Sequence, residues 1–463
     1  MYIRVDIEGT IMRLKPFDFK LPQDEVKKKK RIIYSLSAIL IIVVITIAAS
    51  FAYYQSIELQ NPYNTSVGTF SNGDVIFAVT IDGIDSQTFP TKGSGYVASS
   101  VTCDKSATGI WNNNLWNIEV GNLTQTKTTC NIDFVTETTT LAYKIKQQGG
   151  GASAIEAKGN PAFNAVPTSA TSGLYATPDH YGTSYYYRGE RNSLNNNLIF
   201  AGFQWKIVRI NGDGSIRLIY NGTEAQYNIL NTMNTTGINT HIGTTAFNST
   251  VNDNKYVGYM YSPAGTTAST SSTQAQTNAN DSTIKAYLDN WYANNIANKG
   301  TRITERIADN LFCNDRSITS GTGAGTTVTY YKPYTRHYTN RSNPTPTLMC
   351  ESKNDRFTVS ETTIGNGALT YPVGLLSADE LTYGGNTYSY SNTSQYLYTN
   401  QSFWLLSPSY FLVSGAGGWV VNSTGILVYS DVNNTYGARP ILNLTSGTQV
   451  TGVGSATDPY RVV

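Results

Sequence analysis

One uninterrupted apolar run near the amino terminus restricts the topology of the chain more than any other feature. Residues 32–53 include no charged side chain. As a helix these 22 residues would span roughly 33 Å, enough to cross a hydrocarbon layer of about 30 Å. The basic segment Lys27–Arg31 comes directly before the run, and the next Lys or Arg after it is Lys92. This distribution predicts a single transmembrane helix over 32–53, a cytoplasmic tail of residues 1–31 and an extracellular remainder.

A cleaved signal peptide is the alternative interpretation of the same segment. Ser50 and Ala52 would form an acceptable small-residue cleavage site. However, the apolar run is longer than the usual 7–15 residues of a signal peptide, and about 30 polar residues precede it. We therefore expect an uncleaved anchor and localisation at the cell membrane.

The four cysteines are consistent with export. Cys103 and Cys130 lie in one part of the chain, and Cys313 and Cys350 lie in another. Four thiols allow three pairings, and the sequence alone does not choose among them. Proximity favours Cys103–Cys130 and Cys313–Cys350. No pair has the CxxC spacing of a structural zinc site and the three histidines are widely separated, so we expect no metal or other cofactor.

The low charge of the chain limits the partners that it could bind. Only 14% of the residues are charged, and the formal net charge is +2. This composition gives no electrostatic reason to expect a nucleic-acid partner. With 40 Gly and 33 Tyr, the chain is typical of a β-rich surface protein rather than a cytosolic enzyme.

The distribution of patterned segments predicts a β-rich α+β protein with several parts. Residues 54–66 form a polar stalk, and alternating apolar positions over 67–135 predict a small β-sandwich domain. Residues 136–167, with three consecutive glycines after one short helix, are expected to be a linker. Residues 168–463 form the large carboxy-terminal domain.

The large domain contains recognisable local elements. Residues 200–220 predict a hairpin with its turn at Asn211–Gly214, and residues 282–296 predict an amphipathic helix capped by Asp281 or Ser282. Residues 264–281 are expected to be an exposed loop. A Ser-Pro turn at Ser407–Pro408 is expected to end one strand near the carboxy terminus.

Three groups of potentially reactive residues are interpreted as structural rather than catalytic or metal-binding. Residues 211–215 begin like a calcium loop but lack the distal ligands, which favours a hairpin turn. Asp379 and Glu380 form a paired carboxylate without a local partner, so a helix start or a solvated pair is expected. Cys313 as a nucleophile would need a base such as His337, but Cys350 is the preferred partner in an exported chain.

Tyrosine-rich segments are the best candidates for ligand contact. Tyrosine offers amphipathic contact area at low entropic cost, and it accompanies Ser, Gly and Asn in recognition loops. The same tyrosines would equally well cover a broad sheet or brace long loops. The candidate ligand-binding residues, chosen from loop composition alone, are Tyr185, Tyr187, Tyr331, Tyr334 and Tyr338.

The carboxy-terminal pattern resembles a known family. An aromatic strand ending in Ser-Pro (403–408) precedes a W-x-V hairpin from Trp419 and then Gly437-Ala438-Arg439-Pro440 before a final apolar strand. This order is similar to the C-type-lectin-like module of the formylglycine-generating (sulfatase-modifying) superfamily, as in membrane-anchored bacterial surface proteins. The likeness covers residues 170–463. It implies a C-type-lectin-like α+β fold for residues 168–463.

The resemblance also implies which residues support the fold. Pro440 fixes φ and removes a donor at the start of the last strand, and Arg439 can direct its guanidinium inward to loop carbonyls or a carboxylate. The tryptophans Trp205, Trp404 and Trp419 are expected to lie in the core. Copper-dependent members of the family use a close cysteine pair near the carboxy terminus, and this chain has no cysteine after Cys350.

The sequence thus leads to a hypothesis of a membrane-anchored, non-enzymatic surface protein of a bacterium. Its distal module would bind a glycan, a peptide or a surface protein, as in adhesion. Two alternatives remain: an extracytoplasmic enzyme, of the formylglycine-generating type or another kind, and a structural component of the cell envelope. Fold-level likeness alone does not choose among them.

Overall fold

The computed structural model describes most of the chain after the predicted anchor. The described residues are 3–6, 75–113, 116–123, 127–223, 237–388, 390–413 and 415–463. The predicted transmembrane helix (32–53) and stalk (54–66), and all of the predicted tail except residues 3–6, lie outside these ranges. Within the described ranges, no helix is long and apolar enough to cross a membrane.

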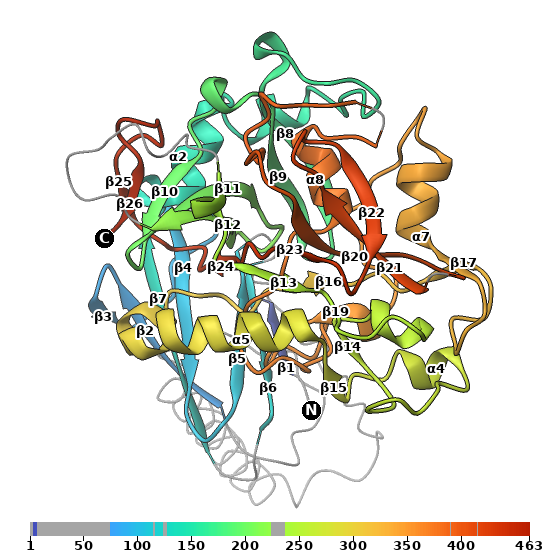
Figure 1. The fold of residues 1–463 in the computed structure, drawn as a ribbon. Coiled ribbons are helices and arrows are strands. Elements are labelled where there is room, and N and C mark those ends of the chain that lie inside the picture. The colour runs from blue at the N-terminus through green and yellow to red at the C-terminus, as the bar shows by residue number, and fades with distance from the viewer. Residues whose placement is uncertain are drawn as a thin grey trace, which may run out of the picture. The chain divides into compact units, whose positions relative to one another are not determined.

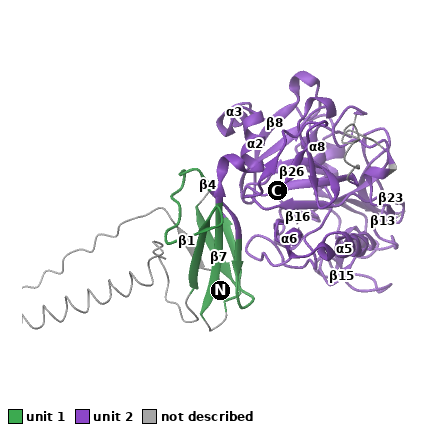
Figure 2. Cartoon of the chain, turned by 90° about the vertical axis from the view of Figure 1, so that its left-hand side faces the viewer, with its two compact units in different colours: residues 1–96, 101–111, 115–134 green, residues 97–100, 112–114, 135–463 purple. Residues whose placement is uncertain are grey.

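The architecture is β-rich α+β, with several sheets and short helices (Figure 1). The chain divides into two compact units (Figure 2). Unit 1 consists of residues 1–96, 101–111 and 115–134, and unit 2 consists of residues 97–100, 112–114 and 135–463.

Two sheets form the amino-terminal part of the described chain. One has the order β3-β2-β7-β4 and the other the order β1-β6-β5. The strands are β1 (Ile3–Asp6), β2 (Val75–Ile81), β3 (Ile84–Ser86), β4 (Tyr96–Cys103), β5 (Thr108–Asn112), β6 (Asn117–Gly121) and β7 (Thr128–Thr136). β2 and β7 are parallel, and β1 is antiparallel to β6.

Aromatic side chains fill the core of unit 1. The rings of Trp111 and Phe134 meet edge to face with centroids 5.1 Å apart, and Phe89 stacks on Trp111 at 5.9 Å. Edge-to-face and offset contacts are the arrangements that aromatic pairs prefer. Cys103 on β4 is bonded to Cys130 on β7, so the pairing favoured by proximity is confirmed.

Unit 2 contains two large sheets. The first has the order β24-β12-β11-β10-β26-β25, with β9 paired to β11 and β8 paired to β9. Its strands are β8 (Gly173–Asp179), β9 (Gly182–Arg188), β10 (Asn197–Phe200), β11 (Phe203–Ile210), β12 (Ile216–Thr223), β24 (Ile441–Leu444), β25 (Val450–Thr451) and β26 (Tyr460–Val462).

The second large sheet has the order β13-β23-β20-β18-β17, with β21 paired to β20 and β22 paired to β21. Its strands are β13 (Thr244–Ala246), β17 (Ile318–Ser320), β18 (Thr329–Tyr331), β20 (Phe403–Leu412), β21 (Gly415–Val421), β22 (Leu427–Asp431) and β23 (Thr435–Gly437). Two short ladders pair β14 (Met260–Tyr261) with β15 (Asn280–Asp281), and β16 (Phe312–Cys313) with β19 (Arg356–Phe357).

Seven short helices connect these strands within the described ranges. They are α2 (Leu141–Gln148), α3 (Ala152–Glu156), α4 (Ser272–Ala275), α5 (Thr283–Asn295), α6 (Thr301–Thr304), α7 (Lys332–Tyr334) and α8 (Ala378–Gly384).

The predicted hairpin is confirmed as β11 and β12. Asn211 donates its backbone N–H to Ser215, and Gly214 occupies the left-handed region with φ of 88°. The Asp213 carboxylate accepts from the backbone and the hydroxyl of Ser215 and from the amide of Asn310. These bonds give residues 211–215 the structure of a hairpin turn.

The strand after Pro440 lies in the core rather than at the periphery. β24 pairs with β12, and Ile441, Leu442 and Leu444 are fully buried. Arg439 is buried and donates to the carbonyl oxygens of Tyr220 and Leu397 at 3.1 and 2.8 Å. The guanidinium therefore joins the final strand to two distant segments of the chain.

The glycine at the entry to this strand is needed for a close approach. A Cβ on Gly437 would lie 2.0 Å from the ring of His241, which is shorter than any non-bonded contact. Trp205, Trp404 and Trp419 are all buried in the core of unit 2.

The predicted Ser-Pro turn is wrong, because Pro408 lies inside β20. The pairing of β20 with β21 shifts register on both sides of Pro408. A β-bulge tolerates proline because the bulged residue does not need to donate a ladder hydrogen bond. The strand therefore continues to Leu412.

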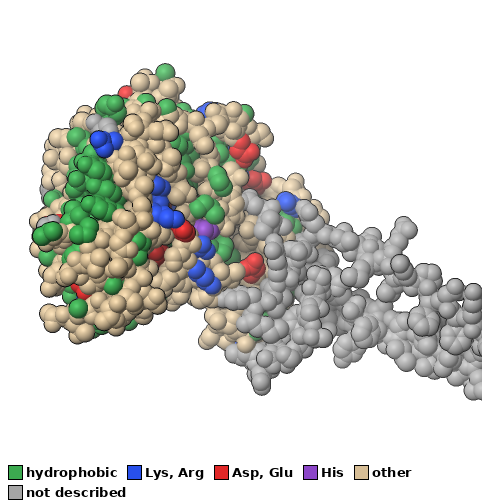
Figure 3. Space-filling view, turned by 90° about the vertical axis from the view of Figure 1, so that its right-hand side faces the viewer, with side chains coloured by type: hydrophobic (Ala, Val, Ile, Leu, Met, Phe, Trp, Pro, Cys, Tyr) green, Lys and Arg blue, Asp and Glu red, His purple; other side chains and the backbone are tan. Residues whose placement is uncertain are grey.

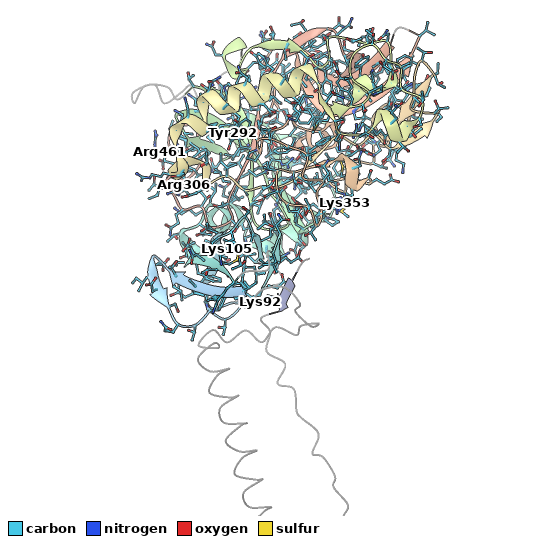
Figure 4. The ribbon with its side chains drawn as sticks, turned by 90° about the horizontal axis from the view of Figure 1, so that it is seen from below. Lys92, Lys105, Tyr292, Arg306, Lys353 and Arg461 are labelled. Atoms are coloured by element: carbon cyan, nitrogen blue, oxygen red, sulfur yellow. A yellow bond between two sulfur atoms is a disulfide. The ribbon has the colours of Figure 1, made fainter. Side chains whose placement is uncertain are left out.

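The predicted amphipathic helix is confirmed as α5, with Ser282 as its cap. The Ser282 hydroxyl accepts from the backbone N–H of Lys285. Ile284, Leu288 and Tyr292 are buried, and Tyr292, labelled on α5 in Figure 4, stacks on Tyr371 at 5.0 Å.

The predicted linker is part of the folded body of unit 2. Leu141 and Ile145 on α2 and Ile155 on α3 are buried in its core. Residues 149–151 end α2, but the chain does not become extended after them, because the apolar face of α3 packs on the same core. Residues 136–167 are therefore not a linker.

The segment 264–281 is also more ordered than expected, since it contains α4 and β15. The buried ammonium of Lys255 donates to the carbonyl oxygens of Pro263, Gly265 and Thr267 at 2.9, 2.9 and 2.6 Å. These three hydrogen bonds from Lys255 hold residues 263–267 in place, although the composition of this segment is typical of a loop.

Candidate ligand-binding surface

Three tyrosines with a spacing of four residues lie in succession along residues 330–338. Tyr330, Tyr334 and Tyr338 belong to β18, α7 and the π-helical turn 335–339. Within the helical part, Tyr334 and Tyr338 are at positions i and i+4, which lie on one side of a helix. The ring centroids of consecutive members are 4.8 and 4.7 Å apart.

The opposite side of this segment is fixed to the interior by charge. Arg336 donates to both carboxylate oxygens of Asp379 at 2.8 and 2.7 Å and to Asp315 at 2.8 Å. His337 Nε2 lies 3.3 Å from the same carboxylate of Asp379. Burial alone would raise the pKa of the Asp379 carboxyl, but Arg336 and His337 hold this pKa well below its ordinary value.

The three tyrosines meet further aromatic side chains of the second large sheet. The ring centroids of Tyr334 and Tyr429 on β22 are 5.8 Å apart, and those of Tyr429 and Tyr410 on β20 are 5.2 Å apart. Tyr338 contacts Tyr388 edge to face at 4.9 Å. We refer to these side chains as the tyrosine cluster, which consists of Tyr330, Tyr334, Tyr338, Tyr388, Tyr410 and Tyr429.

A glycine on β21 makes room for the cluster. A Cβ on Gly417 would lie 2.6 Å from the ring of Tyr410. Two positions later, Trp419 is buried beneath Tyr429 with centroids 5.9 Å apart. Three members of the cluster, Tyr330, Tyr410 and Tyr429, therefore lie on strands of the second large sheet.

Three phenols of the cluster, those of Tyr334, Tyr410 and Tyr429, have raised pKa values and are uncharged at physiological pH. Burial, followed by the neighbouring Tyr388, raises the pKa of Tyr429 to about 12. Burial and the adjacent tyrosines also raise the pKa of Tyr334. Each of these three hydroxyls can thus donate and accept a hydrogen bond, and none of the three carries a phenolate charge.

The cluster is partly open to solvent. Tyr410 is buried, while the other five members are half-buried. Tyr390, which is 53% exposed, and Val413, which is 99% exposed, follow Tyr388 and β20 in the chain. Figure 3 shows the face of the molecule on which Figure 1 places α7 and β17, with hydrophobic side chains gathered in one region and few charged side chains among them.

The tyrosines chosen from the sequence are only partly brought together. Tyr334 and Tyr338 belong to the cluster. Tyr187 and Tyr331 are each 1% exposed and cannot contact a ligand, so we correct these two choices: strand alternation directs both side chains into the core. Tyr185 is half-buried elsewhere and donates to Glu156 at 2.5 Å.

Sequence reasoning missed Tyr330, Tyr388, Tyr410 and Tyr429 as site residues. The spacing of Tyr330, Tyr334 and Tyr338 was a signal that could have identified the first of them. Nothing local in the sequence places β20 and β22 beside residues 330–338, because strand pairing at this distance is a tertiary property.

Asp379 and Glu380 do begin a helix, but they are not solvated. Ser377 and Glu380 form a capping box at the start of α8. Both carboxylates are buried and paired with arginines, Asp379 with Arg336 and Glu380 with Arg209 and Arg217.

Cys313 is bonded to Cys350, which confirms the second disulfide. No free cysteine is present in the described part of the chain. Over the same residues, no group of three His, Cys, Asp or Glu side chains has a metal-binding arrangement.

Comparison with known proteins gives no family for this chain. No family model, no curated protein and no solved structure matches it. The geometry of the described residues is therefore the basis for any statement about function.

Proposed function

We propose that this chain is a membrane-anchored extracellular protein of a bacterium that binds its ligand through the tyrosine cluster. Residues 32–53 would span the membrane, residues 67–135 would form a small β-sandwich, and residues 168–463 would form a C-type-lectin-like module. The apolar run after Lys27–Arg31 and the two disulfides support export.

The observation that carries the binding role is the half-buried tyrosine cluster, three of whose members lie on strands of the second large sheet. Exposed aromatic side chains with polar ends are enriched where proteins bind other molecules. A structural role alone would not require six tyrosines to converge at one place on the surface. The charged side chains beside the cluster are of opposite sign, since Arg341 lies over the Tyr338 ring and Asp431 accepts from the Tyr410 hydroxyl. This balance favours a neutral ligand, such as an uncharged polysaccharide, over a polyanion.

The test is the retention of purified full-length protein, in detergent, on a panel of solid probes. The panel contains bacterial cell walls, neutral polysaccharides such as cellulose, xylan and mannan, and mucin. Retention by at least one probe is expected. The variant Tyr334→Ala/Tyr429→Ala should weaken it by about 30-fold or more, equivalent to about 2 kcal/mol.

Tyr185→Ala is the matched control, because Tyr185 is a half-buried tyrosine outside the cluster. Retention should be unchanged in this variant. If Tyr334→Ala/Tyr429→Ala binds as well as the unmodified protein while remaining folded, the tyrosine cluster is not the binding surface.

A further inference from the structure

A buried lysine lies directly opposite a buried asparagine in the first large sheet. Asn197 on β10 and Lys206 on β11 are register partners in the antiparallel ladder. Their side chains are therefore on the same face of the sheet with Cβ atoms about 5 Å apart. Lys206 is 1% exposed and Asn197 is fully buried.

The two side chains are in contact. The ammonium or amine Nζ of Lys206 donates to Oδ1 of Asn197. The amide Nδ2 of Asn197 donates to the carbonyl oxygen of Gly454 at 2.9 Å. This second bond fixes the plane of the carboxamide and turns its carbonyl toward the lysine.

The surroundings make the lysine nucleophilic. Burial, together with the cations Arg191 and Arg439, lowers the pKa of Lys206 well below its ordinary value. Desolvation and neighbouring cations favour loss of the lysine proton, and the neutral amine is the form that attacks carbonyl carbon. Arg439 is held in place by the carbonyl oxygens of Tyr220 and Leu397, so its positive charge stays near Lys206.

Other buried lysines have different partners. Lys255 donates to three backbone carbonyl oxygens, and Lys285 pairs with the carboxylates of Asp281 and Asp289. Attack of a lysine amine on a backbone amide would break the chain, and attack on a carboxylate would first require activation of the acid. Lys206 faces a primary carboxamide, which can release ammonia.

We infer that Lys206 and Asn197 become joined by an intramolecular isopeptide bond. The Nζ lone pair adds to Cγ of Asn197, a bond forms between Nζ and Cγ, and the bond between Cγ and Nδ2 breaks. One proton moves from Nζ to Nδ2, which leaves as ammonia. The product is a secondary amide, and no oxidant, reductant or co-reactant takes part.

The bond would covalently connect β10 to β11 in a way that reducing agents do not reverse. The two disulfides lie at other positions, Cys103–Cys130 and Cys313–Cys350. An exported protein would thus carry one cross-link in this sheet that survives a reducing environment.

The experiment is mass spectrometry of the full-length protein after denaturation and reduction. The intact mass should be lower than the sequence mass by that of one ammonia. Trypsin should not cleave after Lys206, because its amine is acylated, and the peptide Asn192–Arg209 should be recovered without fragment ions between positions 197 and 206.

Variants supply the controls. Lys206→Met and Asn197→Leu should each retain the full ammonia mass. Asn196→Ala should still lose ammonia, since the amide of the adjacent Asn196 donates to Ile207 instead. Cleavage after Lys255 should be normal.

Two results would overturn the inference. One is an intact mass equal to that of the sequence, with complete tryptic cleavage after Lys206. The other is an ammonia loss that persists in Lys206→Met, which would indicate a cyclic imide at an asparagine. Both readouts come from denatured protein, so they remain decisive even where a variant folds poorly.

Discussion

Replacing Glu380 with alanine is expected to lower the free energy of unfolding of unit 2 by about 3–5 kcal/mol. Glu380 Oε1 accepts from Arg209 at 3.2 Å and from Arg217 at 2.8 Å, and all three side chains are buried. The substitution would leave two guanidinium groups close together in the core. It would also remove the carboxylate that accepts from the backbone of Ser377 at the start of α8.

The same pair predicts a dependence of stability on pH. Burial would raise the pKa of Glu380, but Arg217 and Arg209 lower it below its ordinary value of about 4.3. The stabilisation is therefore fully present above that value and is lost as the pH falls through the lower pKa of the folded state. Burial lowers the pKa of Arg217 only to about 10, so this partner stays charged throughout.

Urea unfolding over a series of pH values from 7 down to about 2 measures both effects. Glu351→Ala is the matched control, because Glu351 pairs with Lys332 at the exposed surface, and it should change stability by about 0.5 kcal/mol or less. A Glu380→Ala protein as stable as this control at pH 7 would show that the buried network contributes little.

Removal of the Cys313–Cys350 disulfide should destabilise unit 2 and abolish ligand retention together. The two cysteines are 37 residues apart, and closure of such a loop stabilises the fold by roughly 4 kcal/mol in the chain-entropy model. Tyr330, Tyr334 and Tyr338 all lie inside the loop. Without the disulfide, only non-covalent contacts hold the segment that carries these three tyrosines against the rest of unit 2.

The comparison is between two double variants. Cys313→Ser/Cys350→Ser should lower the unfolding free energy of unit 2 by about 2–5 kcal/mol and prevent retention on the probe that the unmodified protein binds. Cys103→Ser/Cys130→Ser should affect the unfolding of unit 1 and leave retention intact, because that bond joins β4 to β7. Equal loss of retention in both variants would contradict the assignment of the binding surface.

The sequence predicted those features that depend on local pattern. The turn at residues 211–214, the cap at Ser282 and the apolar strand after Pro440 each follow from neighbouring residues, and the structure confirms them. The disulfides were also found, because each pair is close in the sequence.

The features that depend on tertiary neighbours were not predicted. Leu141 and Ile155 fall in a glycine-rich segment, and only the core of unit 2 shows why they fold. Asp379 and Glu380 resembled a solvated pair because their arginines lie 43 to 171 residues away. For the same reason, composition selected Tyr187 and Tyr331, which are buried, and did not select Tyr429.

The proposed anchor and one observed strand lead to opposite expectations for the amino terminus. Residues 3–6 form β1 and pair with β6, which requires both segments to be on one side of any membrane. A helix at residues 32–53 that spans the membrane would place residues 3–6 in the cytoplasm. The anchored form of the protein would therefore lack this pairing.

Cysteine labelling in intact cells tests the central claim most directly. A membrane-impermeant maleimide is applied to cells that produce full-length Val413→Cys or Glu8→Cys, before and after permeabilisation. Val413 is 99% exposed, so display outside the cell predicts labelling of Val413→Cys in intact cells and of Glu8→Cys only after permeabilisation. Protection of Val413→Cys in intact cells, or labelling of Glu8→Cys without permeabilisation, would contradict an outward-facing binding module on a cytoplasmic tail.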